Sequence, residues 1–156
     1  MNLRPSRSRW KLALTGLLMT VACGDPVLRR VASDTVTSGA LSVHTAYALP
    51  PFTDSPMPVY LTVRNAGPAA DTLLGATSSA SAHVMLHGSG AMDAAGSLVV
   101  PPDDSLVLAP GGTHLMLEPP LPRFARGDSV AVTLRFARAG EVTIRAVVVD
   151  YADLPL

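Results

Sequence analysis

The sequence contains a single cysteine, Cys23, and this scarcity removes several classes of site. One cysteine cannot form an internal disulfide. Because Cys23 lies near the N-terminus, the rest of the chain also has no thiolate to offer. The sequence therefore excludes a cysteine-ligated zinc finger, a CxxC redox site and a blue-copper centre, each of which needs cysteine.

Aromatic and basic residues are also scarce. Aromatic residues make up 4% of the 156 residues and hydrophobic residues 48%, so a core has to be built from Val, Leu and Ala. Residues 1–22 hold four of the twelve basic residues and no acidic one, which leaves eight basic and twelve acidic residues, a formal charge of −4. A chain without a basic patch lacks the electrostatic footprint of nucleic-acid binding, and we expect no nucleic-acid partner.

Hydrophobic runs are short. The run at 12–22 follows a basic N-terminal segment and is too short to span a bilayer comfortably, a pattern typical of a signal peptide over residues 1–22. Cys23 follows directly, and the stretch resembles the lipobox of bacterial lipoproteins, although Thr20 stands where Leu is usual. One interpretation is that Cys23 is lipidated and anchors the chain to a membrane; the other is an ordinary secretory signal with an unrelated cysteine. Both predict an extracytoplasmic protein, in the bacterial periplasm or cell envelope.

The remainder of the chain indicates one β domain. Residues 24–40 show little periodicity and are expected to form a flexible tether. From 41 to 149, about eight or nine short alternating segments separated by Pro- and Gly-rich turns predict an all-β sandwich, cupredoxin-like or Ig-like, and 150–156 form a C-terminal tail. No segment has a convincing helical period. In 41–48, strict alternation predicts that Thr45 and Tyr47 share the face of Val43.

Histidine and methionine are concentrated in residues 83–116. This segment holds three of the four His and three of the four Met that follow the leader. Side chains of a strand alternate between its faces, so one face presents imidazole and thioether groups and the other faces the core. The polar faces carry His83, Met85 and His87 in one strand and His114 and Met116 in another. These donors predict a metal site, and soft thioethers favour Cu(I).

Four landmarks along the chain resemble the PCuAC family of periplasmic copper chaperones. They are residues 59–67, 84–87, 110–117 and 139–142, in the family's order, and the resemblance covers 41–149. It implies a cupredoxin-like fold, Cu(I) binding through His and Met, and delivery of copper to a recipient such as a copper site of cytochrome c oxidase.

The resemblance implies His87, His114 and Met116 as ligands. The family motif is His, ten residues, Met, twenty-one residues, His, one residue, Met. Here twenty-six residues separate His87 from His114, where the family has thirty-two, and Leu98 stands at the position of the missing Met. Met92, in a Gly-rich loop, is the expected substitute. Met85 is the alternative, about 7 Å along the strand from His87, and His83 is a further candidate.

These observations favour a carrier over a catalyst. The sequence has no Gly-x-Ser-x-Gly motif and no placed acid–base pair, so we expect no enzymatic activity. We predict a monomeric Cu(I) carrier with a copper-accepting partner protein and a lipid anchor. The alternative is a lipid-anchored Ig-like interaction module that has lost metal binding.

Overall fold

The computed structural model describes residues 24–88, 96–119 and 121–154. These residues form one short α-helix, ten strands and one 3₁₀-helix. In chain order the elements are α1 (Pro26–Ser33), β1 (Thr35–Ser38), β2 (Leu41–Ala48), β3 (Met57–Asn65), β4 (Asp71–Thr77), β5 (Val84–His87), β6 (Leu98–Val100), β7 (Ser105–Leu108), β8 (His114–Leu117), β9 (Ser129–Phe136), β10 (Gly140–Val148) and η1 (Tyr151–Asp153).

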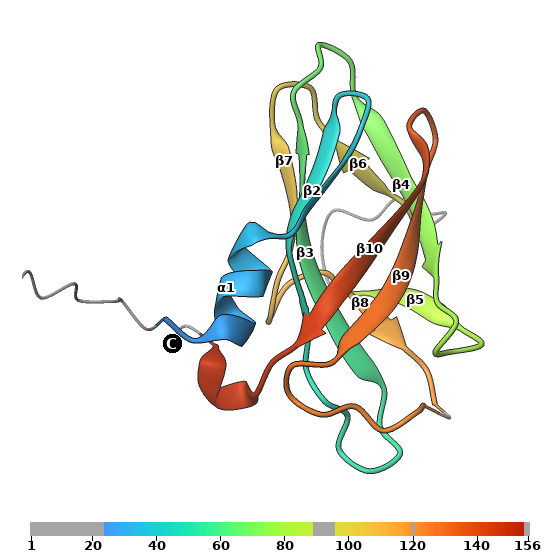
Figure 1. Ribbon diagram of the computed structural model, residues 1–156. Helices are drawn as coiled ribbons and strands as arrows, with labels where there is room; N and C mark the ends of the chain where they lie inside the picture. Colours follow the sequence, from blue (N-terminus) through green and yellow to red (C-terminus); the bar gives the residue numbers. More distant parts are fainter. Residues whose placement is uncertain (1–23, 89–95, 120, 155–156) are drawn as a thin grey trace, which may run out of the picture.

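The ten strands form one curled sheet that folds over into two layers (Figure 1). The strand order is β5-β8-β3-β2-β10-β9-β4-β6, with β1 beside β2 and β7 beside β3. All of these pairings are antiparallel except that of β10 with β2. The predicted all-β sandwich is confirmed. The strand beyond the predicted eight or nine is β1, which lies in the segment expected to be a tether.

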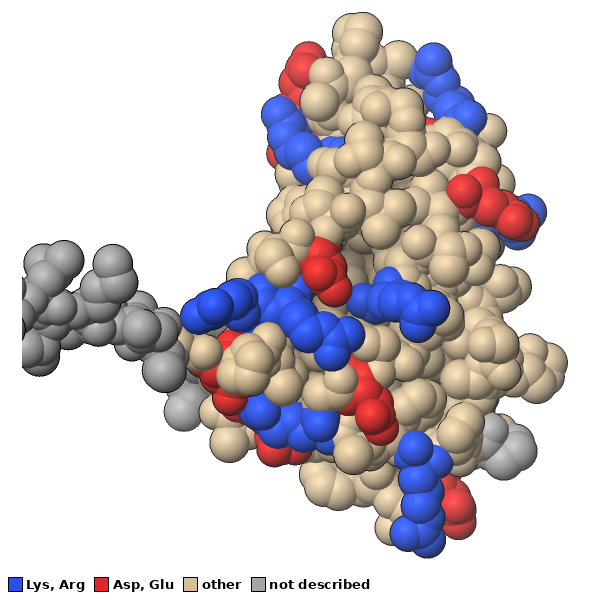
Figure 2. All heavy atoms as spheres, in the orientation of Figure 1, with Lys and Arg blue, Asp and Glu red and all other residues tan. Residues whose placement is uncertain are grey.

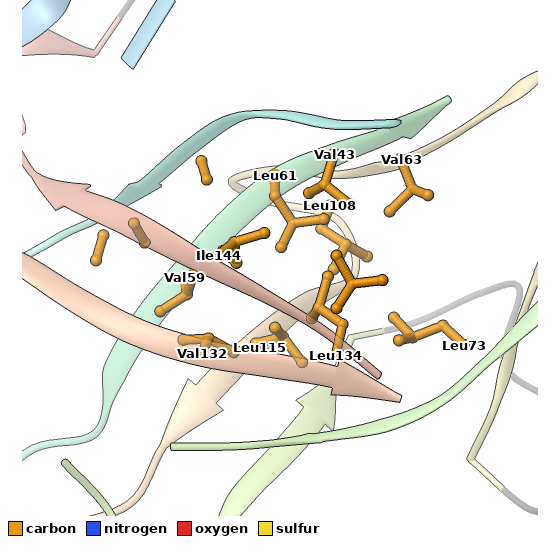
Figure 3. Close-up of a cluster of buried hydrophobic side chains, with 14 of the residues drawn as sticks. Val43, Val59, Leu61, Val63, Leu73, Leu108, Leu115, Val132, Leu134 and Ile144 are labelled. Carbon is orange, nitrogen blue, oxygen red and sulfur yellow. The ribbon is translucent and has the colours of Figure 1, made fainter. Parts of the chain in front are cut away.

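The space between the layers is filled by aliphatic side chains. Figure 3 shows Val43 and Leu61 on one side of this space, with Val132 and Leu134 of β9 on the other. Phe136 is the one aromatic ring among the fully buried residues of this cluster. Burial of each such side chain contributes about 1.5–3 kcal/mol. The core therefore has the Val- and Leu-rich composition that the scarcity of aromatic residues predicts.

A bulge in β2 overturns the strict alternation expected there. Thr45 has a φ of 54°, and the register of β2 against β3 shifts between His44 and Tyr47. One extra residue reverses the faces of the strand beyond it, so Ala46 becomes buried and Tyr47 points outward. The bulge also separates the half of β2 that pairs with β1 from the end that pairs with β10.

The prediction of a flexible tether at 24–40 is wrong, because α1 and β1 lie in this segment and are folded against the domain. Asp25 caps α1, its Oδ1 accepting a hydrogen bond from the backbone N–H of Val27 at 2.8 Å. Val27 and Val31, one helical turn apart, pack against a small cluster on the outer face of the sheet. Arg30 donates hydrogen bonds of 2.9 Å to Gly127 O and to Ser129 Oγ. Within the described residues, neither helix has the length and apolar character needed to cross a membrane.

Candidate metal centre

The His- and Met-bearing strands are neighbours in the sheet. β5 lies at one end of the strand order and pairs in antiparallel register with β8. In this register Met85 lies opposite Met116, and His87 lies opposite His114. Leu115 and Leu117 point into the core and are fully buried. The four donor side chains therefore share the outer face of one two-stranded ribbon.

The two imidazole rings lie close together. The ring centroids of His87 and His114 are 5.2 Å apart, with the ring planes at 61°. Side chains directly opposite on antiparallel strands have Cβ atoms about 4.5–5.5 Å apart, so Met85 and Met116 are also neighbours on this face. Met85 is 50% exposed and His87 is exposed, whereas His114 and Met116 are half-buried. The face is thus open to solvent from the β5 side.

A hydrogen bond from the preceding turn orients His114. Its Nδ1 lies 2.8 Å from Gly112 O. A carbonyl oxygen can only accept, so this contact requires the proton on Nδ1 and leaves the Nε2 lone pair of the neutral ring for a metal. The turn closes through the Gly112 N–H, which donates to Ala109 O at 3.0 Å.

Tyr60 forms a wall on the other side of His114. The two ring centroids are 5.6 Å apart, and Tyr47 packs against Tyr60 at 5.1 Å. Tyr60 is 6% exposed, and this burial raises the pKa of its phenol. The Tyr60 phenol therefore remains neutral at ordinary pH. Its ring, packed between Tyr47 and His114, limits the movement of the His114 imidazole. This contact was not predicted from the sequence; the available signal was the outward position of Tyr60 in the alternation of β3.

Gly88 fixes the end of β5 against the start of β8. Its φ is +140°, and a Cβ built on it would lie 2.6 Å from Thr113 Cα. No side chain fits at that separation, so the backbones approach as closely as they do because residue 88 is glycine. This approach directly follows His87 and directly precedes His114. It places both rings at the same end of the ribbon.

Two candidate ligands, Met92 and His83, remain to be considered. Met92 lies outside the described residues. His83 precedes β5 and is exposed, with its backbone carbonyl accepting a hydrogen bond from the Glu118 N–H at 3.0 Å. In the described part of the chain, no group of three or more His, Cys, Asp or Glu side chains is placed to hold a metal ion. The donors that this face offers are two imidazoles and two thioethers, and this mixed donor set suits soft Cu(I).

The fold has counterparts among known proteins. The family described as "Putative lipoprotein LpqE-like" matches residues 41–148. The chain belongs to this LpqE-like family. A relative in Leifsonia xyli subsp. xyli, "Putative lipoprotein Lxx21020", is 34% identical over 97 residues, which span 58% of each chain.

Solved structures similar to the LpqE-like chain are PCuAC domains, which confirms the resemblance found in the sequence. The copper-bound PCuAC domain from PmoF2 is 28% identical with a TM-score of 0.67, covering 75% of this chain and 98% of that domain. The apo PCuAC domain from PmoF1 is 26% identical with a TM-score of 0.68, covering 78% and 100%. The Cu(I) form of DR1885 from Deinococcus radiodurans shares the fold at 22% identity, with a TM-score of 0.55 and coverage of 80% and 86%.

Proposed function

We propose that the chain is an extracytoplasmic copper chaperone that binds Cu(I) as cargo and passes it to a recipient protein. The observation that carries this proposal is the cross-strand pairing of Met85 with Met116 and of His87 with His114. The similarity to the copper-bound PCuAC domain from PmoF2 supports copper as the metal.

The proposed ligands are His87, His114 and Met116, with Met85 as the fourth. Met85 is favoured over Met92 because β5 pairs Met85 directly with Met116, so no loop has to fold over the strands to complete the set. Met92 remains the competing fourth ligand. His83, which directly precedes β5 and is exposed, is not proposed as one of the four ligands. We propose that it binds the ion only transiently during transfer.

The donor chemistry suits a carrier outside the cytoplasm. A thioether carries no proton at ordinary pH, and an imidazole binds metal only in its neutral form. Cu(I) affinity should therefore fall on acidification through the two imidazoles alone. With no thiolate in the set, disulfide formation cannot destroy the site.

Transfer is proposed to occur by ligand exchange at the exposed edge. Met85 and His87 lie on an end strand and are exposed, so a recipient's ligands can replace them first while His114 and Met116 still hold the ion. The recipient implied by the PCuAC resemblance is a copper site such as that of cytochrome c oxidase.

The proposed location is the periplasm or cell envelope, with the protein anchored to a membrane. Residues 1–22 would be removed as a signal peptide and Cys23 lipidated, and membership of a family described as lipoproteins supports this. We propose that the carrier acts as a monomer.

A competition titration with a chromogenic Cu(I) chelator under reducing conditions tests the proposal. The protein should bind one Cu(I), and H114A/M116A should lose this binding while its unfolding curve remains cooperative. His44 lies on β2 beside Thr45 and away from the ribbon, so H44A is the matched histidine control and should bind normally. Absence of competition by the unmodified protein would contradict the proposal and favour a metal-free interaction module.

The fourth ligand is tested by comparing M85A with M92A in the same titration. Mutation of a residue that only hydrogen-bonds to a metal ligand typically weakens metal affinity about 10–100-fold. Loss of a ligand itself should weaken Cu(I) affinity at least as much. M85A should show this loss and M92A should bind like the unmodified protein. The reverse result would assign the position to Met92.

A further inference from the structure

Two aromatic rings are exposed side by side at one end of the domain. Phe52, in the loop between β2 and β3, is 68% exposed, and Tyr151, at the start of η1, is 43% exposed. Their ring centroids are 4.9 Å apart and the planes nearly parallel, at 22°. Leu28, on the first turn of α1, is also exposed. We call the paired rings of Phe52 and Tyr151 the apolar face.

An ion-pair cluster joins η1 to the point where the folded chain begins. Arg126 Nη2 lies 2.7 Å from Asp25 Oδ2, and Arg126 Nε lies 2.9 Å from Asp153 Oδ2. Asp150 Oδ2 lies 3.5 Å from the same Nε. Asp25 caps α1, and Asp150 and Asp153 flank Tyr151. The start of α1 and the apolar face are therefore held together, as the neighbouring positions of α1 and η1 in Figure 1 show.

The lipid anchor would attach very close to this cluster. The inference rests on the proposed lipidation of Cys23. Only Gly24 separates Cys23 from Asp25, and two residues span at most about 7 Å. The polar headgroup region of one leaflet is about 5–7 Å deep. A lipid on Cys23 therefore brings Asp25, and the apolar face with it, to the bilayer surface.

The chemistry of this end of the domain fits a lipid surface. Tyrosine is enriched at membrane–water interfaces, where its apolar ring and polar hydroxyl match the headgroup level. Arg126 is surrounded by three carboxylates, and Figure 2 shows blue and red residues interspersed on this side of the molecule. Such a balanced surface has no need of anionic lipid, so contact should be driven by burial of apolar area.

We propose that the apolar face rests in the headgroup layer of the membrane that carries the Cys23 anchor. The fixed contact, rather than a swivelling tether, then sets the orientation of the domain. Figure 1 places β5 across the domain from η1. The exposed strand β5, which carries Met85 and His87, thus lies on the side of the domain away from the apolar face, where a recipient protein can reach it.

The experiment uses two properties of the sequence. Cys23 is the single cysteine, so the chain from residue 23 onward, which contains every described element, can be coupled to a maleimide-headgroup phospholipid in vesicles. Trp10 in the leader is the single tryptophan, so F52W introduces a lone indole at the apolar face. V99W is the matched control, since Val99 is 53% exposed on β6, away from η1.

When the protein is coupled to vesicles, the emission maximum of F52W should shift to the blue relative to that of the uncoupled protein. The emission should also lose intensity when the vesicle lipids carry brominated acyl chains. The V99W emission should change in neither respect. The F52W response should be the same in zwitterionic and anionic vesicles and at low and high salt. Equal behaviour of the two indoles would overturn the proposal, as would an F52W response confined to anionic vesicles at low salt.

Because the coupling is chemical, this result does not depend on lipidation in the cell. Mass analysis of Cys23 from the expressed full chain tests that step separately. An unmodified Cys23 together with an F52W response would refute the proposed anchor while leaving the membrane affinity of the apolar face intact.

Discussion

Substitution of Gly88 by alanine should damage both stability and copper binding. A Cβ at residue 88 would lie 2.6 Å from Thr113 Cα and 3.0 Å from Gly112 O and from Thr113 N. All three neighbours are backbone atoms, which cannot rotate away as the end of a side chain can. The ends of β5 and β8 must therefore separate, and His87 and His114 are the residues next to this contact.

The expected magnitude has two parts. At the Gly88 φ of +140°, an L side chain strains the backbone by about 1–3 kcal/mol. The overlap with β8 resembles overpacking of a core and adds about 1–3 kcal/mol. The sum of about 2–6 kcal/mol should lower the midpoint of thermal unfolding by roughly 3–5 °C for each kcal/mol, given a domain of this size. Cu(I) affinity should fall with it, because the two rings no longer face one another.

The control for this prediction is G111A. Gly111 lies in the turn before β8 at a φ of +77°, but a Cβ there meets nothing within 4 Å. G111A should therefore lower the free energy of unfolding by only about 1–2 kcal/mol, the strain of the left-handed conformation alone. Urea unfolding and Cu(I) titration of both variants separate strain from overlap. Equal loss in G88A and G111A would refute the argument that close backbone approach holds the two histidines together.

Three further predictions concern the packing, the ion pairs and the bulge. Leu115 is fully buried beneath the candidate ligands, so L115A should lower the free energy of unfolding by about 2–5 kcal/mol in urea; a change below 1 kcal/mol would contradict this. Hydrogen bonds from Arg126 lower the pKa values of Asp25 and Asp153. The stability that these two carboxylates contribute is therefore present above the ordinary carboxyl pKa and is lost as the pH falls through the lowered values. R126Q should remove this part of the acid dependence of the unfolding midpoint, and an unchanged pH profile would refute the prediction. Thr45 has a left-handed φ of 54°, so T45G should raise the free energy of unfolding by up to about 1 kcal/mol, and a clear loss in calorimetry would disprove the strain.

Much of the fold follows from local patterns that the sequence shows directly. In β9, for example, Val130, Val132, Leu134 and Phe136 alternate with polar or small residues, and the strand ends before the turn at 137–139. The presence of His and Met on one face of β5 and one face of β8 follows from the same period of two. That these two strands are neighbours does not follow from any local pattern. Pairing of segments separated by twenty-six residues depends on the whole sheet.

The features that the sequence analysis missed depend on tertiary contacts. α1 has eight residues and only Val27 and Val31 on its packed side, too short a pattern to reveal a helix, and it is held by Arg30 and Asp25 contacts with distant residues. The bulge at Thr45 places a β-branched residue where glycine or asparagine would have signalled it. In the sequence, Met85 is only the alternative to Met92, because it lies about 7 Å from His87 along one strand. Its position opposite Met116 becomes visible only with the register of β5 on β8.

The most direct test of the proposed centre is X-ray absorption at the copper K-edge on Cu(I)-loaded protein. Two imidazole nitrogens from His87 and His114 and two thioether sulfurs from Met85 and Met116 should coordinate the metal in the unmodified chain. M85A should retain one sulfur, whereas M92A should retain both. A spectrum with nitrogen or oxygen neighbours alone would contradict the proposed centre. It would show that no thioether binds the metal, and the assignment to Cu(I) depends on the thioethers.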